Sequence, residues 1–108
     1  MSIPTMYNKN KTYAGYNTSS TVYLIAYVND NAYPKTLAVN TQPSTGYGGA
    51  KVSITKSDLT VVASKVFPYY QSVSDLTVGV PSGTLRRIYV EPGTAGQTIV
   101  GNLGYESY

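Results

Sequence analysis

The chain has 108 residues, of which 42% are hydrophobic, and it carries eight Lys and Arg against five Asp and Glu, giving a net charge of +3. This length suits one domain, and the hydrophobic share excludes ordinary disorder. His and Cys are absent, which excludes the usual metal sites, a Ser-His or Cys-His nucleophile pair and a disulfide framework. We therefore expect a protein that is not an enzyme and holds no metal or cofactor.

Tyrosine dominates the aromatic residues, with twelve tyrosines, one phenylalanine and no tryptophan. Its ring is apolar while its hydroxyl forms hydrogen bonds, a combination that is typical of surfaces contacting another molecule. The excess positive charge is spread along the chain, unlike the clusters that neutralise phosphates. Composition therefore favours a protein that contacts other proteins over one that binds nucleic acid.

Residues 1–20 contain Lys, Asn, Ser, Thr and three tyrosines, with few other apolar side chains. Such a segment cannot bury a core of its own, so we predict an extended N-terminal arm that becomes ordered on a neighbour. Its first part, MSIPTMYNKNKTYAG, lacks the hydrophobic core of a signal peptide, and no apolar run in the chain approaches the ~20 residues of a membrane span. We expect synthesis in a cytoplasm and no membrane partner.

Residues 21–29 form the clearest strand, because they are dense in β-branched and aromatic side chains. Regular alternation would place on one face Val22, Leu24, Ala26 and Val28, and on the other Tyr23, Ile25 and Tyr27. Both faces are apolar. Such a strand is either covered on both sides or has its tyrosine face against a partner.

The middle of the chain alternates between turn signals and short strands. Residues 29–31 (Asn-Asp-Asn) predict a turn, and a short strand is expected at 36–40. A Gly/Pro/Ser-rich loop at 42–49 carries Tyr47 near its tip. Residues 50–55 then alternate between apolar and polar side chains, which is the pattern of a half-buried strand.

Residues 57–67 fit two structures. Five apolar side chains fall at the spacing of a helix: Leu59, Val62, Ala63, Val66 and Phe67. We favour a strand, because the β-branched run disfavours a helix and the surroundings read as β. Further on, residues 84–90 alternate well, 91–94 suit a turn, and 97–100 are expected to return as the hairpin partner.

Short strands separated by turn signals, with no strong helix, predict an all-β fold. We expect a single β-domain at 21–108, a small antiparallel sandwich or barrel, with the extended arm at 1–20. Jelly-roll, Ig-like and OB-like versions all remain compatible with the pattern.

Each candidate catalytic residue is better explained by a structural role. Asp58 and Asp75 occupy the same place in two copies of Ser-Asp-Leu-Thr-Val, where we expect turn capping rather than the acid pair of a glycosidase. Arg86 and Arg87 are adjacent on a predicted strand, so they point to opposite faces and cannot converge on one phosphate. The sequence therefore indicates no catalytic residue.

Two binding functions remain as alternatives. The first is a small β-barrel that binds single-stranded nucleic acid by stacking and charge, through Lys9, Lys11, Tyr7, Tyr13, Tyr16, Tyr23, Tyr27, Arg86 and Tyr89. The second is a carbohydrate-binding module, in which Tyr47, Tyr69 and Tyr70 form a shallow platform beside Asn-rich loops. Protein assembly is favoured over both, because tyrosines on a small β-domain more often meet another protein.

The arm MSIPTMYNKNKTYAGYNTSS, the body rich in Thr, Ser, Gly and Tyr, and the end GNLGYESY resemble the small capsid-decoration, cement and tail proteins of bacteriophages. The resemblance is one of composition and organisation over the whole chain, and it includes no diagnostic motif. It implies a virion component, made in the host cytoplasm, that clamps capsid or tail subunits together without catalysis.

We expect this structural protein to act as a homo-oligomer or on a larger shell. An arm of about 20 residues can extend over roughly 60 Å and wrap a neighbour. The residues expected to form the interface lie on the arm, on one face of the strand at 21–29 and at the C-terminal end: Tyr7, Tyr13, Tyr16, Tyr23, Ile25, Tyr27, Tyr105 and Tyr108.

Overall fold

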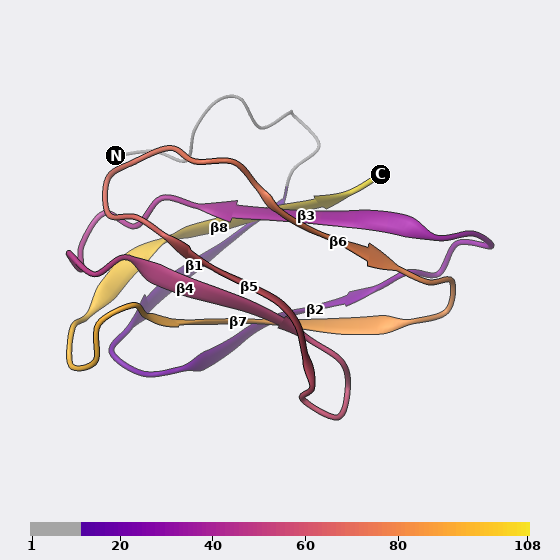
Figure 1. Ribbon diagram of the computed structural model, residues 1–108, viewed down its shortest axis with the longest axis horizontal. Coiled ribbons are helices and arrows are strands. Elements are labelled where there is room, and N and C mark those ends of the chain that lie inside the picture. Colours follow the sequence, from indigo (N-terminus) through magenta and orange to yellow (C-terminus); the bar gives the residue numbers. More distant parts are fainter. Residues whose placement is uncertain (1–11) are drawn as a thin grey trace.

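The computed structural model of the protein describes residues 12–108, which form eight strands (Figure 1). These are β1 (Thr12–Thr18), β2 (Val22–Val28), β3 (Lys35–Thr41), β4 (Ala50–Thr55), β5 (Val61–Phe67), β6 (Leu76–Val80), β7 (Leu85–Pro92) and β8 (Ile99–Ser107). Two four-stranded sheets result, with the strand orders β1-β8-β3-β6 and β2-β7-β4-β5. All pairings are antiparallel. The predicted all-β sandwich is confirmed.

The pairing scheme identifies the type of sandwich. The pairs β1–β8, β2–β7, β3–β6 and β4–β5 are those of one long antiparallel hairpin whose tip lies between β4 and β5. Rolling this hairpin places successive pairs in alternate sheets and adds the contacts β3–β8 and β4–β7. This nested order defines an eight-stranded jelly roll, the choice that the sequence pattern left open.

The core lies between the inner faces of the two sheets, and the two-residue period of a strand explains which side chains enter it. In β4, for example, Ala50, Val52 and Ile54 are buried, whereas Lys51 and Ser53 point outward. The same alternation in the other strands brings into the core Tyr16, Leu37, Val39, Phe67, Val80, Ile88, Val90, Ile99 and Leu103. Each fully buried aliphatic or Phe side chain contributes about 1.5–3 kcal/mol.

The ambiguous segment 57–67 forms a turn followed by β5, so the favoured strand interpretation is confirmed for residues 61–67. The turn is closed by two backbone bonds, from the Leu59 amide to the Lys56 carbonyl (3.0 Å) and from the Lys56 amide to the Thr60 carbonyl (2.9 Å). Asp58 accepts a bond from the Thr60 amide at 3.0 Å, which lowers the pKa of its carboxyl group. Asp58 therefore caps the turn, as expected.

A β-bulge in β2 overturns the expected arrangement of its faces. Tyr23 pairs with Tyr89, but the next paired residue is Ile25, opposite Ile88. The extra residue reverses the alternation, so Ile25 and Tyr27 pack against the core while Tyr23 stays on the outer face. The prediction that Tyr23, Ile25 and Tyr27 share one face was wrong, because it assumed an uninterrupted period of two.

The last strand is also placed differently from the expectation. β7 extends through Pro92, and the chain then crosses to the other sheet, where β8 lies between β1 and β3. The expected hairpin between 84–90 and 97–100 does not form. The connection at 93–98 contains two glycines and directly follows Pro92, and these signals indicate only that the chain turns. They do not indicate which sheet the next strand joins.

Four loops gather at one end of the sandwich, which we call the loop end: 19–21, 42–49, 68–75 and 93–98. The loop at 42–49 contacts two of the others. The Gly48 amide donates to Oε1 of Gln97 (3.0 Å), and the Tyr70 amide donates to the Pro43 carbonyl (3.1 Å). Segments distant in the sequence therefore form one surface there.

Asn29 joins the loops at the opposite end. Its side chain is fully buried, and Nδ2 donates to the carbonyls of Tyr33 (3.0 Å) and Val80 (2.9 Å). Its Oδ1 accepts a bond from the Asn31 amide at 3.0 Å. This polar group is thus fully used, which is the condition for burying it at low cost.

Part of the predicted arm at 1–20 lies within the described range. Residues 12–18 form β1, an edge strand paired with β8, and Tyr16 on this strand enters the core. The sheet therefore includes seven residues of the segment assigned to the arm. Residues 1–11 lie outside the described residues, and the role of the arm in assembly stays a prediction.

Candidate interaction surfaces

Two tyrosines and an arginine form a partly exposed patch on the outer face of the sheet β2-β7-β4-β5. Tyr23 and Tyr89 are directly paired across the two strands, and their rings stack with centroids 5.1 Å apart and 26° between the planes. The guanidinium carbon of Arg87 lies 5.3 Å from the centroid of the Tyr23 ring, which is cation–π geometry. Tyr23 remains 50% exposed. We call these three residues the β2–β7 patch.

The charges around this patch alternate in sign. The adjacent Tyr89 side chain raises the pKa of Arg87, while Nε of Arg87 is buried and has no hydrogen-bond partner among the described residues. In a neighbouring row of the same face, Lys51 pairs across the strands with Glu91, which also accepts a hydrogen bond from the Thr21 hydroxyl at 3.3 Å. A surface of mixed sign with exposed aromatic rings fits a protein partner better than a phosphate backbone.

The neighbouring arginine points the other way. Arg86 is buried opposite Tyr27, and its Nη1 donates to the Leu85 carbonyl at 3.0 Å. Its Nε has no hydrogen-bond partner among the described residues. The two arginines therefore lie on opposite faces, as predicted, and do not converge on one ligand.

The other predicted contact residues divide between the core and the surface. Three pack against the core from the inner faces of their strands: Ile25, Tyr27 and Tyr105. Two have exposed side chains: Tyr13 on β1 and Tyr108 at the C-terminal end. Tyr7 lies outside the described residues. The contact residues expected from the sequence are thus divided between the core and the surface, and their role in an interface stays a prediction.

Tyr16 belongs to the interior and is unavailable to a partner. Only 6% of it is exposed, and its hydroxyl lies 2.6 Å from Oγ1 of Thr41. Thr41 donates its own hydrogen to the Asn102 carbonyl at 2.8 Å, so the Tyr16 hydroxyl is the donor to Thr41. Burial raises the pKa of Tyr16 to about 12. The ring packs over Gly101, where an added Cβ would lie 2.6 Å from the hydroxyl oxygen.

A second group of exposed aromatic rings lies at the loop end. The Tyr47 and Tyr69 centroids are 4.9 Å apart with an edge-to-face angle of 67°, and those of Tyr69 and Tyr70 are 5.0 Å apart at 79°. Tyr47 is 80% exposed. These residues, here called the loop-end tyrosines, come from the loops at 42–49 and 68–75. The sequence analysis predicted that these three tyrosines form a platform for a sugar, and in the structure their rings are in contact.

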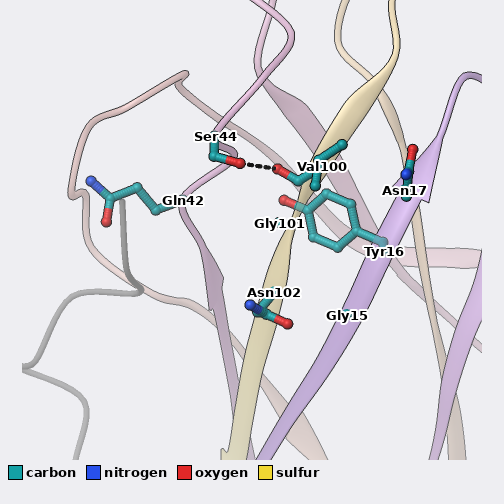
Figure 2. A pocket seen from close by; sticks show the side chains of 8 residues that line it. All are labelled: Gly15, Tyr16, Asn17, Gln42, Ser44, Val100, Gly101 and Asn102. Atoms are coloured by element: carbon teal, nitrogen blue, oxygen red, sulfur yellow. Dashed lines mark hydrogen bonds between the residues drawn. The ribbon is translucent and has the colours of Figure 1, made fainter.

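A shallow depression of about 430 Å³ lies between β1 and β8 beside the same loops (Figure 2). Gly15 and Gly101 contribute no side chains to its lining, and Val100 adds an apolar one. The other lining residues are Asn17, Gln42, Ser44, Asn102 and Tyr16. Gln42 and Tyr16 are themselves nearly buried, at 5% and 6% exposed. The Ser44 hydroxyl donates to the Val100 carbonyl at 3.1 Å. No local pattern in the sequence indicates this depression, because its lining residues come from β1, β8 and the loop at 42–49 and are adjacent only in the folded chain.

Other kinds of site are not found in the part of the chain that is described. No group of three or more Asp and Glu side chains within residues 12–108 is placed to hold a metal ion. No helix long and apolar enough to cross a bilayer occurs among these residues either.

Comparison with known proteins gives one structural match. No family model matches the chain, and no curated protein matches its sequence. A solved structure described as "Structure of infectious bursal disease virus Gx strain" aligns with a TM-score of 0.39 and 14% identity, covering 92% of this chain and 30% of that one. The chain thus spans less than a third of that protein. The fold assigned above rests on the strand order of this chain.

Proposed function

We propose that the chain is a non-enzymatic structural protein that assembles with copies of itself and with the subunits of a virion, as a capsid-decoration, cement or tail component. Eight-stranded jelly rolls occur in viral capsid proteins, lectins and cupins. A cupin-like role needs a ligand site between the sheets, whereas aliphatic and aromatic side chains fill that space here. The candidate binding groups of this chain lie on its outer surface, which fits assembly.

The β2–β7 patch carries the proposal. Tyrosine and arginine are enriched among the residues that contribute most to protein interfaces. Here the rings of Tyr23 and Tyr89 are held in a stack by strand pairing, and Arg87 is positioned over one of them. A patch already ordered on a rigid sheet loses little conformational freedom when a partner covers it. It is therefore suited to a lasting contact.

The arm supplies a second contact in this proposal. β1 is the edge of its sheet, and among the described residues only β8 pairs with it. Residues 1–11 precede this edge and carry Tyr7. A neighbour wrapped by the arm would add buried surface next to β1. Because Tyr16 belongs to the core, a truncation that tests the arm must stop before Thr12.

Sedimentation velocity over a concentration series tests this function on the full chain. We expect self-association, and we expect Tyr23→Ala and Arg87→Ala each to raise the dissociation constant by at least about tenfold, the effect of roughly 1.4 kcal/mol. Removal of residues 1–11 should weaken association without loss of the β-sheet signal in circular dichroism.

Tyr33→Ala is the matched control. Tyr33 is 60% exposed and also has a cation near its ring, Nζ of Lys35 at 5.8 Å, but it lies at the end of the sandwich opposite to the loop end. It should leave association unchanged. A wild-type protein that stays monomeric at all concentrations and fails to bind virion subunits would refute the proposal, as would equal effects of Tyr33→Ala and Tyr23→Ala.

Binding of single-stranded nucleic acid is the competing function, and one observation favours it. Stacked tyrosines beside an arginine on a sheet face can hold unpaired bases. The opposite charge of Glu91 on the same face counts against a phosphate partner. Retention of single-stranded DNA that decreases steeply with salt and is lost in Arg87→Ala would replace the assembly function with this one.

A further inference from the structure

We propose that the loop end carries a carbohydrate-binding site, in which the depression between β1 and β8 and the adjacent loop-end tyrosines hold a neutral oligosaccharide. This site is separate from the β2–β7 patch and gives the protein a second, independent binding activity. Three features carry the inference: the chemistry of the lining, the shape of the floor and the connection between the depression and the tyrosines.

The polar lining is uncharged. The exposed side chains of Asn17 and Asn102 each offer an amide oxygen as acceptor and an NH2 group as donor, which is the combination that pairs with sugar hydroxyls. The Ser44 hydroxyl has its hydrogen directed to Val100 and keeps lone pairs to accept another bond. Among residues 12–108, no Lys, Arg, Asp or Glu lines the depression. A phosphate, a sulfate or an acidic peptide would lack a counter-charge there, whereas a neutral polyol would not need one.

Gly15 leaves part of the floor open, whereas the position of a Cβ at Gly101 is occupied by Tyr16. An added Cβ at Gly15 would lie 3.2 Å from Oδ1 of Asn102, so any side chain there would crowd this amide. Gly101 is likewise fixed, by the Tyr16 ring that packs against it. The volume of about 430 Å³ falls within the range of roughly 300–1,000 Å³ that is typical of small-ligand sites.

Pro43 connects the depression to the loop-end tyrosines. It lies between two lining residues, Gln42 and Ser44, and its carbonyl accepts the hydrogen bond from the Tyr70 amide at 3.1 Å. Tyr70 has a positive φ of 60°. Such a conformation is costly for a residue with a Cβ, and it occurs often at binding sites where surrounding contacts hold it. The bond to Pro43 and the ring contact with Tyr69 are such contacts.

The tyrosines supply the apolar part of sugar recognition. One side of a pyranose ring carries mainly C–H groups, which pack on aromatic faces, while its hydroxyls need polar partners nearby. Tyr47, at 80% exposed, presents its ring to solvent. Because the site joins the depression to rings on two loops, we infer an oligosaccharide rather than a monosaccharide.

The test uses the full chain on an array that displays neutral, sialylated and sulfated glycans, followed by calorimetric titration with the neutral oligosaccharide that binds best. We expect binding to neutral glycans that is unaffected by 0.5 M salt. Tyr47→Ala and Asn102→Ala change exposed side chains, so both variants should fold, and each should weaken binding by at least about tenfold, as expected for the loss of roughly 1.4 kcal/mol.

Tyr23→Ala and Tyr33→Ala are the matched controls, because each removes an exposed tyrosine elsewhere and should leave glycan binding unchanged. Conversely, Tyr47→Ala should leave sedimentation unchanged, which separates this site from the assembly function. The proposal is overturned by an absence of binding to neutral glycans, by binding confined to anionic glycans, or by equal losses in Tyr23→Ala and Tyr47→Ala.

Discussion

Replacing Tyr16 by Phe should change how the stability of the protein responds to alkaline pH. The pKa of Tyr16 is about 12 in the folded chain, against an unfolded value near 10. The unfolded state therefore loses this proton first as the pH rises. Stability from the neutral phenol is complete below pH 10 and is lost as the pH rises toward 12.

The size of the effect follows from the two pKa values. Between pH 9 and pH 11 this group should remove about 1.3 kcal/mol from the free energy of unfolding, and by pH 12 about 2.3 kcal/mol. Tyr16→Phe abolishes that contribution. At neutral pH the variant also lacks the bond to Thr41, at a cost of about 1 kcal/mol, so it should begin less stable and lose less on going to pH 11.

Urea unfolding followed by far-UV circular dichroism, at one-unit steps from pH 7 to pH 11, measures both effects. The other tyrosines are present in both proteins, so their titration cancels in the difference between the two curves. The difference should shrink above pH 10 and change sign near pH 11. Two curves that stay parallel from pH 7 to pH 11 would refute the account of Tyr16 as a buried, neutral hydrogen-bond donor.

Two further substitutions test the polar groups inside the sandwich. Asn29→Ala leaves the part-buried carbonyl of Tyr33 and the buried carbonyl of Val80 without their donor, so it should lower the free energy of unfolding by about 2–4 kcal/mol, seen as a lower urea midpoint. A loss below about 0.5 kcal/mol would mean that water replaces these bonds. Arg86→Met removes a buried guanidinium whose Nε is unpaired and keeps much of its volume, so the urea midpoint should stay the same or rise. A marked drop in the urea midpoint would indicate that the guanidinium makes a stabilising interaction in the folded protein.

The sequence predicts the class of fold well, because the class depends on local patterns. The alternation in 50–55 survives as β4, and Asp58 caps its turn as expected. The face assignments in β2 failed because a bulge adds one residue between Tyr23 and Ile25. A bulge depends on pairing with a distant strand, and no local pattern in this segment predicts it.

Long-range arrangement was the part that the sequence could not provide. Because β8 joins the other sheet, the fold is a jelly roll and not a simple β7–β8 hairpin. No residue pattern at 93–98 predicts this placement. Tyr16 looked like part of an exposed arm because its neighbours are polar, but strand pairing directs its ring inward. The loop-end tyrosines were identifiable by type, whereas their contact depends on two loops that the fold brings together.

The position of β8 also has a consequence for folding during synthesis. Residues 99–107 form an interior strand of their sheet, flanked by β1 and β3, although they are made after both. The pair β4–β5 is local and can form early, but β1 must wait for a partner more than eighty residues away in the chain, which makes closure slow. Until β8 has been synthesised and paired, β1 and β3 have unpaired strand edges that can pair with other chains. The nascent protein would then depend on chaperones or dilution until residues 99–107 have been translated.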